Sequence, residues 1–103
     1  MSTLSTHVLD TAAGRPARGI AVRLETRDGE LLGEGVTDDD GRVGSIGPER
    51  LERGAYVLRF DTVAYAEGFY PEVVIVFTVA DAEQHYHVPL LLSPYGYTTY
   101  RGS

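Results

Sequence analysis

Apolar and polar side chains alternate along most of this chain, and that period of two limits its fold more than any other feature. Ile20, Val22 and Leu24 would lie on one face of a strand, and residues 55–60 repeat the pattern. Clusters of Gly, Pro and Asp interrupt the alternation at short intervals, and no long stretch has the spacing of an amphipathic helix. The pattern predicts an all-β sandwich of about eight strands in two sheets.

Two segments depart from simple alternation. Residues 73–77 are continuously apolar and mostly β-branched, which suits a strand covered on both faces by the core and a partner subunit, or one that lies wholly in the core. Between Asp61 and Pro71, the stretch from Thr62 to Glu67 is the only plausible helical turn. We therefore expect at most one short helix.

Composition excludes several classes of function. The sequence has 103 residues, so we expect one domain spanning residues 1–103. Nine Lys and Arg against 15 Asp and Glu give a formal net charge of -6, which disfavours nucleic acid as a partner. There is no cysteine, which removes disulfides, thiolate metal sites and cysteine nucleophiles. Neither a basic, apolar leader nor a membrane-spanning run is visible, so we predict a cytoplasmic protein without a membrane partner.

The pair His85 and His87 would place two imidazoles on one side of a strand, and such a pair can start a metal site. Zinc needs further ligands, which the sequence supplies poorly, so we predict no metal and no cofactor. We expect His85 to be exposed and His87 to line a cleft. The run Asp38-Asp39-Asp40-Gly41 lacks the ligand spacing of a calcium loop and indicates a turn before Arg42, the first residue of the next strand.

His7, Arg42 and His87 could converge in one cleft. An imidazole that takes a proton from water, beside a guanidinium that holds an oxyanion, would suit hydrolysis of an activated carbonyl. Because Arg42 is always charged, it should also favour neutral imidazoles. The sequence leaves open which histidine is the base. Asp10 could orient a histidine, but capping of a turn is the better interpretation of that residue.

Three segments resemble the transthyretin-like 5-hydroxyisourate hydrolases. They are His7-Val8-Leu9-Asp10-Thr11, the Asp40-Gly41-Arg42 motif, and residues 85–103 with their ending Tyr100-Arg101-Gly102-Ser103. The chain differs from the family pattern in having Asp38 in place of Asn and Thr98 in place of Ser, and both residues keep a hydrogen-bonding group. The connection from Asp61 to Pro71 is also several residues shorter than in the family.

The resemblance implies a transthyretin-like sandwich that assembles as a homotetramer, a dimer of dimers with sites at the dimer–dimer interface. It implies that His7, Arg42 and His87 are catalytic and that His7, Arg42, Tyr100 and Ser103 bind the substrate. The implied reaction is hydrolysis of the small molecule 5-hydroxyisourate, in urate breakdown, to 2-oxo-4-hydroxy-4-carboxy-5-ureidoimidazoline. The alternative is a non-catalytic carrier or interaction sandwich. Transthyretin itself shares the fold but lacks both histidines and the Tyr-Arg-Gly-Ser ending, which favours the enzyme.

Overall fold

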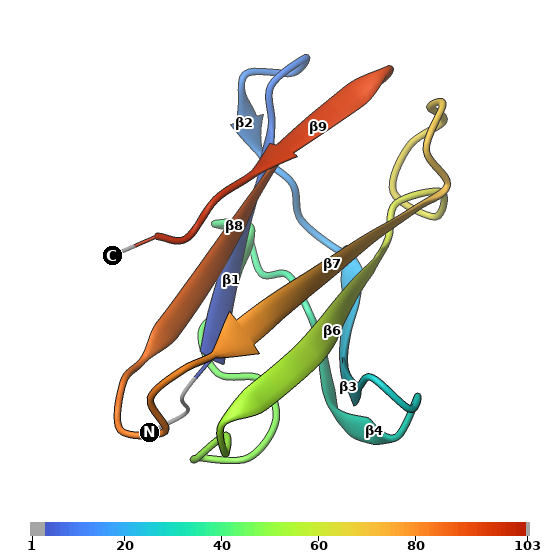
Figure 1. Ribbon diagram of the computed structural model, residues 1–103. Coiled ribbons are helices and arrows are strands. Elements are labelled where there is room, and N and C mark those ends of the chain that lie inside the picture. The colour runs from blue at the N-terminus through green and yellow to red at the C-terminus, as the bar shows by residue number, and fades with distance from the viewer. Residues whose placement is uncertain (1–3, 103) are drawn as a thin grey trace.

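A computed structural model describes residues 4–102 and shows two β-sheets packed face to face (Figure 1). The described strands are β1 (Leu4–Asp10), β2 (Arg15–Pro16), β3 (Ala21–Thr26), β4 (Leu31–Val36), β5 (Arg42–Val43), β6 (Gly54–Asp61), β7 (Glu72–Val79), β8 (Tyr86–Ser93) and β9 (Gly96–Thr99). The expected all-β sandwich is confirmed. Its strand number is close to the predicted eight, because β2 and β5 contain only two residues each.

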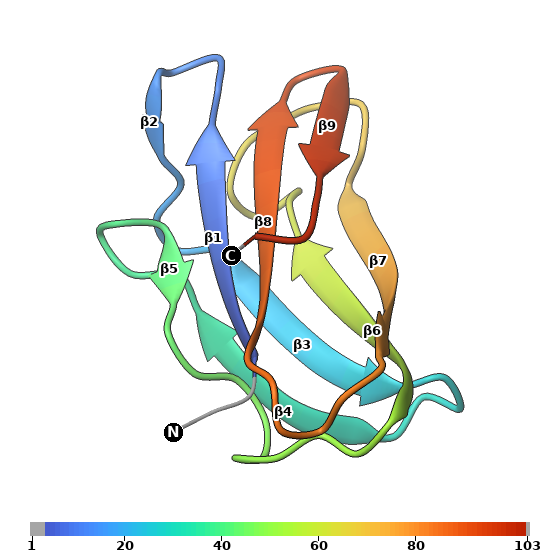
Figure 2. The ribbon, with the colours of Figure 1, turned by 60° about the vertical axis from the view of Figure 1, so that its left-hand side comes forward.

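The first sheet has five strands in the order β2-β1-β8-β9, with β5 also paired to β1. Both short strands pair with the same edge of β1, β2 near its end and β5 near its middle (Figure 2). The pairing of β1 with β8 is parallel, and the other pairings are antiparallel. The first strand, β1, and the penultimate strand, β8, therefore lie side by side in the middle of this sheet.

The second sheet runs β4-β3-β6-β7 and is antiparallel throughout. Its inward side chains confirm the predicted alternation, since Val22, Leu24, Leu58 and Phe60 are fully buried. They pack against Leu4, Val8 and Leu90 and the other inward side chains of the first sheet in one hydrophobic core. Burial of apolar surface between two sheets is the main stabilising contribution in such a sandwich.

β7 is covered on one face only in the isolated chain. Val73 and Ile75 point into the core, whereas Val74 and Val76 are 39% and 53% exposed. The interpretation of residues 73–77 as a strand lying wholly in the core is therefore wrong. The alternation of an antiparallel strand places every second residue on the outer face even where the sequence is continuously apolar.

The segment between β6 and β7 contains one turn and no helix, and no helix is found elsewhere in residues 4–102. The backbone N–H groups of Tyr65 and Ala66 both donate to the carbonyl of Thr62. The Thr62 hydroxyl donates to the carbonyl of Tyr70, which closes the loop after this turn. No helix within residues 4–102 is long and apolar enough to cross a membrane.

Candidate active site

The outer face of the five-stranded sheet brings together the polar side chains that the sequence singled out. Along β1 the inward residues Leu4, Thr6 and Val8 are buried, so Ser5 and His7 point outward. His7 is paired directly with Arg42 of β5, and Ser5 with His87 of β8. Cα atoms paired in this way lie about 5 Å apart. Register alone therefore places one guanidinium and two imidazoles in adjacent positions.

Arg42 is held by the turn that precedes it. The Asp38 carboxylate accepts hydrogen bonds from the backbone N–H groups of Asp40 and Arg42, both at 2.9 Å. The bond from Arg42 is the main reason why the pKa of Asp38 lies below its usual value. Gly41 has a φ of 75°, and a Cβ there would lie 2.3 Å from the carbonyl oxygen of Val8. The turn therefore needs glycine at this position to bring Arg42 against β1.

His7 is oriented by the same turn. Its Nε2 lies 2.8 Å from the carbonyl oxygen of Asp40. A carbonyl oxygen can only accept, so the proton must be on Nε2 and that nitrogen donates. In the neutral imidazole, Nδ1 then keeps its lone pair.

His87 has a different kind of partner. The Ser5 hydroxyl lies 2.8 Å from Nδ1 of His87 and 2.9 Å from Nε2 of His85. A cavity of about 250 Å³ opens at this point, lined by Ser5, Thr6, Arg42, Gly44, His85 and His87. Arg42 and His87 therefore share one cavity, with His7 next to Arg42 along the sheet. As expected, His85 is exposed, whereas His87 is partly buried.

The electrostatics of the cavity favour a neutral His87. Its pKa is lowered from the ordinary value of 6.5, first by burial and then by the positive charges of Arg42, His7 and His85. Burial removes water that would solvate an imidazolium, and nearby cations repel it. The lowered pKa therefore favours the unprotonated form of His87, which is able to accept a proton.

The chain's last described residues return to this face. The tail after β9 crosses back over β8, where the Gly102 N–H donates to the His87 carbonyl at 2.8 Å (Figure 2). A Cβ on Gly102 would lie only 2.5 Å from Cδ2 of the His87 ring. Arg101 is anchored beside it, with its guanidinium 4.6 Å from the centre of the Tyr86 ring. The tail thus packs directly against a site histidine.

The structure does not bring Tyr100 into the cavity that contains His87. The Tyr100 side chain is 56% exposed and lines a separate cavity of about 220 Å³ with Ile75, Phe77 and Val88. Ser103, which was also expected to line the site, lies outside the described residues. Within residues 4–102, no group of three or more His, Asp or Glu side chains is arranged to hold a metal ion.

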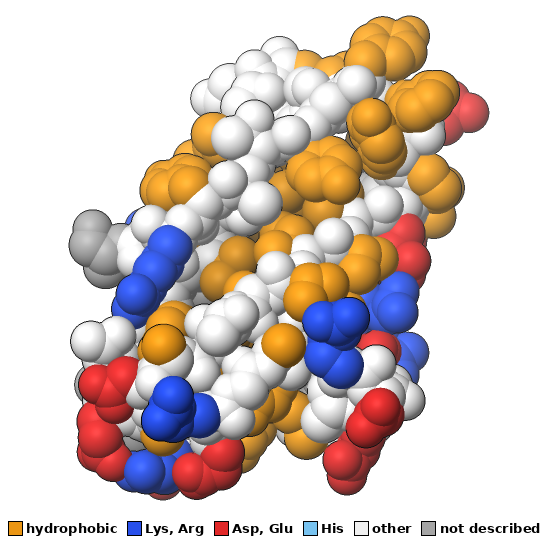
Figure 3. Space-filling view, viewed as in Figure 1, with side chains coloured by type: hydrophobic (Ala, Val, Ile, Leu, Met, Phe, Trp, Pro, Cys, Tyr) orange, Lys and Arg blue, Asp and Glu red, His pale blue; other side chains and the backbone are white. Residues whose placement is uncertain are grey.

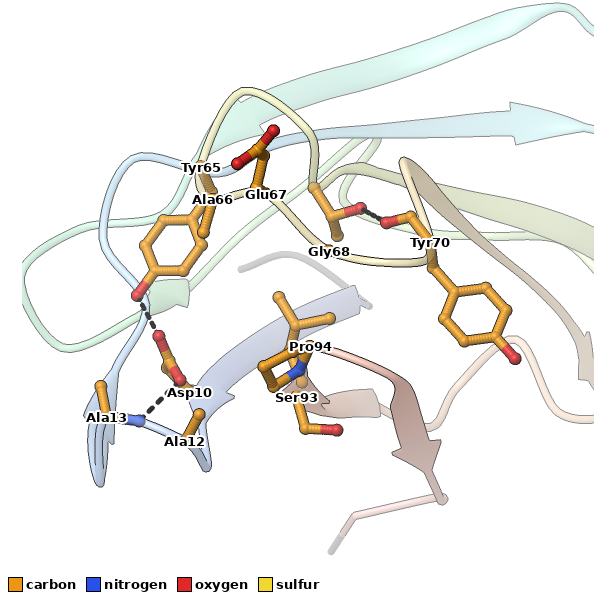
Figure 4. A pocket seen from close by; sticks show the side chains of 12 residues that line it. Asp10, Ala12, Ala13, Tyr65, Ala66, Glu67, Gly68, Tyr70, Ser93 and Pro94 are labelled. Carbon is orange, nitrogen blue, oxygen red and sulfur yellow. Dashed lines mark hydrogen bonds between the residues drawn. The ribbon is translucent and has the colours of Figure 1, made fainter.

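Asp10 lies at the far end of β1 and caps a turn, as expected. Its carboxylate accepts from the Ala13 N–H at 2.9 Å and from the Tyr65 hydroxyl at 2.6 Å (Figure 4). The bond from Tyr65 is the main cause of the lowered pKa of Asp10, and the same bond raises the pKa of Tyr65. These side chains border a larger cavity of about 310 Å³ under the segment between β6 and β7. Asp10 therefore orients no histidine.

Sequence reasoning missed Ser5. The residue looked like an ordinary hydroxyl in the first strand, and only the parallel pairing of β1 with β8 places it opposite His87. The spacing of His85 and His87 was the available signal, since it implied that any residue facing His87 could also reach His85.

The chain is similar over nearly its whole length to proteins of one family. Residues 4–102 match the HIUase/Transthyretin family. The 5-hydroxyisourate hydrolase of Caulobacter vibrioides is 49% identical over the full length of both chains. That of Mus musculus is 47% identical over 99% of this chain and 96% of its own.

Solved structures agree with the sequence comparison. The structure of Klebsiella pneumoniae 5-hydroxyisourate hydrolase superposes with a TM-score of 0.90 at 39% identity and covers both chains completely. Sea bream transthyretin in complex with thyroxine superposes with a TM-score of 0.87 at 32% identity, over 97% of this chain and 94% of its own. The fold is therefore shared by a 5-hydroxyisourate hydrolase and a transthyretin that binds thyroxine, so the fold alone does not distinguish the two functions.

Proposed function

The chain belongs to the HIUase/Transthyretin family, and we propose that within this family it is a 5-hydroxyisourate hydrolase with its active site on the outer face of the five-stranded sheet. The reaction opens the six-membered ring of 5-hydroxyisourate to 2-oxo-4-hydroxy-4-carboxy-5-ureidoimidazoline, a step of urate catabolism. The observation that carries this proposal is the cavity shared by Arg42 and His87, with His7 paired to Arg42 in the adjacent strand.

We assign the catalytic roles to His7, Arg42 and His87. Water adds to the ring carbonyl while a neutral imidazole takes its proton, and Arg42 stabilises the negative charge that develops on the carbonyl oxygen. The C–N bond of the ring then breaks, and the departing nitrogen receives a proton from the imidazolium. Both histidines retain a nitrogen lone pair when neutral, so the chemistry needs only side chains and water.

The proposed substrate contacts also include Tyr100 and Ser103. Their support is the anchoring of the tail at Gly102, two residues after Tyr100 and one before Ser103, against His87. Because terminal residues are ordered only where something holds them, this packing indicates a role for the tail at the site. Deletion of residues 100–103 should leave the circular dichroism spectrum unchanged and strongly reduce hydrolysis, with a milder loss for Tyr100→Phe. Full activity after the deletion would contradict the proposal that Tyr100 and Ser103 contact the substrate.

We further propose that residues 1–103 form one domain and assemble as a homotetramer, a dimer of dimers with the sites between dimers. Val74 and Val76 expose apolar surface on β7. Hydrophobic side chains also gather at the end of the molecule where β9 meets the segment between β6 and β7 (Figure 3). They include Phe69, Tyr70 and Tyr97, and the ring of Tyr70 contacts the rings of the other two. Such patches are typical of surfaces that subunits cover.

Light scattering at micromolar concentration should give the mass of four chains. A stable, active monomer would contradict both the assembly and the sites between dimers. Cytoplasmic location stays a prediction from the sequence.

The decisive experiment is an absorbance assay with freshly prepared 5-hydroxyisourate. The protein should accelerate its decay well above the spontaneous rate, and Arg42→Ala should abolish most of that acceleration. A folded protein that leaves the spontaneous rate unchanged would favour the alternative function, a non-catalytic carrier.

A further inference from the structure

On the basis of the proposed hydrolase function, we propose that Ser5 is a positioning residue that sets the tautomer of His87 and connects it to His85 as a proton relay. The Ser5 hydroxyl oxygen lies within hydrogen-bond distance of Nδ1 of His87 and of Nε2 of His85. Neither Ser5 nor His85 has a role in the mechanism described above. The Ser5 hydroxyl nevertheless occupies Nδ1 of His87, an imidazole that we assign to catalysis, and links it to His85.

Counting protons gives the relay a direction. A serine hydroxyl has one proton to donate, and its oxygen can accept. If His87 is to accept a proton at Nε2, its own proton must be on Nδ1 and must be donated to Ser5. The Ser5 hydroxyl is then free to donate to Nε2 of His85, whose proton is on Nδ1. Reversing both bonds gives the opposite tautomer of each histidine.

The relay lets His87 accept a proton without keeping the charge. When Nε2 of His87 takes a proton from water, the Nδ1 proton can pass to Ser5 while the Ser5 proton passes to Nε2 of His85. His87 is then neutral with its proton on Nε2, and His85 carries the positive charge. The reverse transfer restores the starting state, so the cycle consumes no proton.

The surroundings of His87 favour this transfer. The titratable groups around it are His7 from β1, Arg42 from β5 and His85 immediately before β8. Arg42 is always charged and repels a positive charge on the ring, and the two histidines do so when they are protonated. Arg101 of the tail lies over the ring of Tyr86, which faces the core. His85 is exposed whereas His87 is partly buried, so water stabilises the charge better at His85.

The tautomer of His7 cannot be changed by a relay of this kind. Its Nε2 is bonded to the carbonyl oxygen of Asp40, which has no proton to give and fixes one tautomer. Of the two imidazoles assigned to catalysis, His87 is the one whose hydrogen-bond partner among residues 4–102 can both donate and accept.

The test compares Ser5→Ala, which removes the hydroxyl, with Ser5→Thr, which keeps it. Ser5→Ala should lower kcat by about tenfold with little change in KM, because the relay acts on proton transfer and not on substrate binding. Ser5→Thr should stay within about twofold of the wild type. His85→Ala should lower kcat less than His87→Ala does, because His87 takes the proton from water and His85 receives it afterwards through Ser5.

A second measurement needs no substrate. Nitrogen-15 NMR of the imidazoles should show the wild-type His87 protonated on Nδ1 and His85 protonated on Nδ1, and Ser5→Ala should shift the tautomer populations of His87. The hydroxyl oxygen stabilises imidazolium by accepting its Nδ1 proton, so Ser5→Ala should also move the acid limb of the rate profile to lower pH.

Unchanged tautomers and an unchanged kcat in Ser5→Ala would overturn the relay. Equal losses in Ser5→Ala and Ser5→Thr would also overturn it, because packing would then be the cause. Wild-type protein that does not hydrolyse 5-hydroxyisourate would instead contradict the proposed function, whatever the NMR spectra show.

Discussion

The outer faces of the two sheets use charge in opposite ways. On the four-stranded sheet, Glu25 lies between two arginines, with Arg59 at 3.0 Å and Arg23 at 3.6 Å, and Arg59 also contacts Glu72 at 3.3 Å.

On the five-stranded sheet, Arg42 is paired with His7 and shares a cavity with His87. Its backbone N–H and its charge both help to lower the pKa of Asp38, but within residues 4–102 no carboxylate forms an ion pair with it.

The difference separates charges that support the fold from charges that remain available for chemistry. Glu25 is buried, and the positive charges of Arg23 and Arg59 compensate its negative charge. These groups are therefore engaged with one another and support the fold.

The positive charge of Arg42 adds to burial in lowering the pKa of His87. Since no carboxylate of residues 4–102 forms an ion pair with Arg42, its guanidinium could bind the negative charge that develops in the proposed reaction. We call Arg42 and the two histidines assigned to catalysis uncompensated, because none of them forms an ion pair with a carboxylate of residues 4–102, and this distinguishes the proposed site from the opposite sheet.

The largest effect should come from removing the uncompensated groups. His7→Ala, Arg42→Ala and His87→Ala should each lower kcat/KM by about 10² or more, as expected for acid–base and oxyanion groups, while the fold stays intact. Arg59→Ala is the matched control on the opposite sheet. It should lower thermal stability and leave kcat/KM within about twofold, because it removes a compensated charge. Equal losses of activity for Arg42→Ala and Arg59→Ala would erase the distinction between the two faces.

A smaller effect should follow from crowding the site without removing any charge. Gly102→Ala places a methyl group where the His87 ring now lies, so either the ring or the tail must move. We expect kcat/KM to fall about tenfold, since small displacements of catalytic groups are costly. Gly96→Ala is the control, because its Cβ would meet only the Ser93 hydroxyl at 3.7 Å. The same assay on both variants decides whether the approach of the tail to His87 matters.

The sequence predicted much of this arrangement, and what it missed depends on long-range pairing. Alternation identified the buried faces around Leu24 and Leu58, and the Asp-Gly turn correctly placed Arg42 at the start of a strand. Local patterns do not encode which strands pair or in what register, because packing of the whole core decides this. The parallel pairing of Ser5 with His87 joins residues 82 positions apart and could not be read from either segment.

The position of Tyr100 illustrates the same limit. Its place after the last strand was evident from the sequence, but the direction of its ring depends on how the tail packs against Tyr86 and β8. Asp10, in contrast, accepts a hydrogen bond from the N–H of Ala13, only three residues away, and the sequence assigned this turn correctly.

The pH dependence of the activity should reveal how the surroundings of His87 lower its pKa. Because the pKa of His87 lies below 6.5, the acid limb that belongs to this residue should have its midpoint below pH 6.5, and activity should fall as pH drops through it. Arg42→Gln removes a repelling charge and should raise that pKa, whereas Arg42→Lys should keep it low. NMR titration of the His87 ring measures the pKa in all three proteins without relying on activity. A His87 that titrates at or above 6.5 in the wild type would show that the cations around it do not act as described.

The smallest effect on activity should come from a substitution next to Asp10, a charged residue on the same strand as His7 whose carboxylate is already hydrogen-bonded. The Tyr65 hydroxyl donates to the Asp10 carboxylate at the end of β1, and Tyr65→Phe removes that bond and nothing else. A hydrogen bond to a charged, partly exposed group contributes about 1 kcal/mol, so thermal melts at equal protein concentration should show a loss of a few degrees.

Because the bond lowers the pKa of Asp10, its contribution is complete above the unfolded pKa of about 3.9 and is lost as pH falls through the lower folded value. Because it raises the pKa of Tyr65, the contribution also declines as pH rises above the unfolded value of about 10 and through the higher folded one. The stability difference between the two proteins should therefore be largest between these limits, while kcat/KM stays near that of the wild type. A large loss of hydrolysis in Tyr65→Phe would instead couple this end of β1 to His7 and show that compensated and uncompensated charges on one strand are not independent.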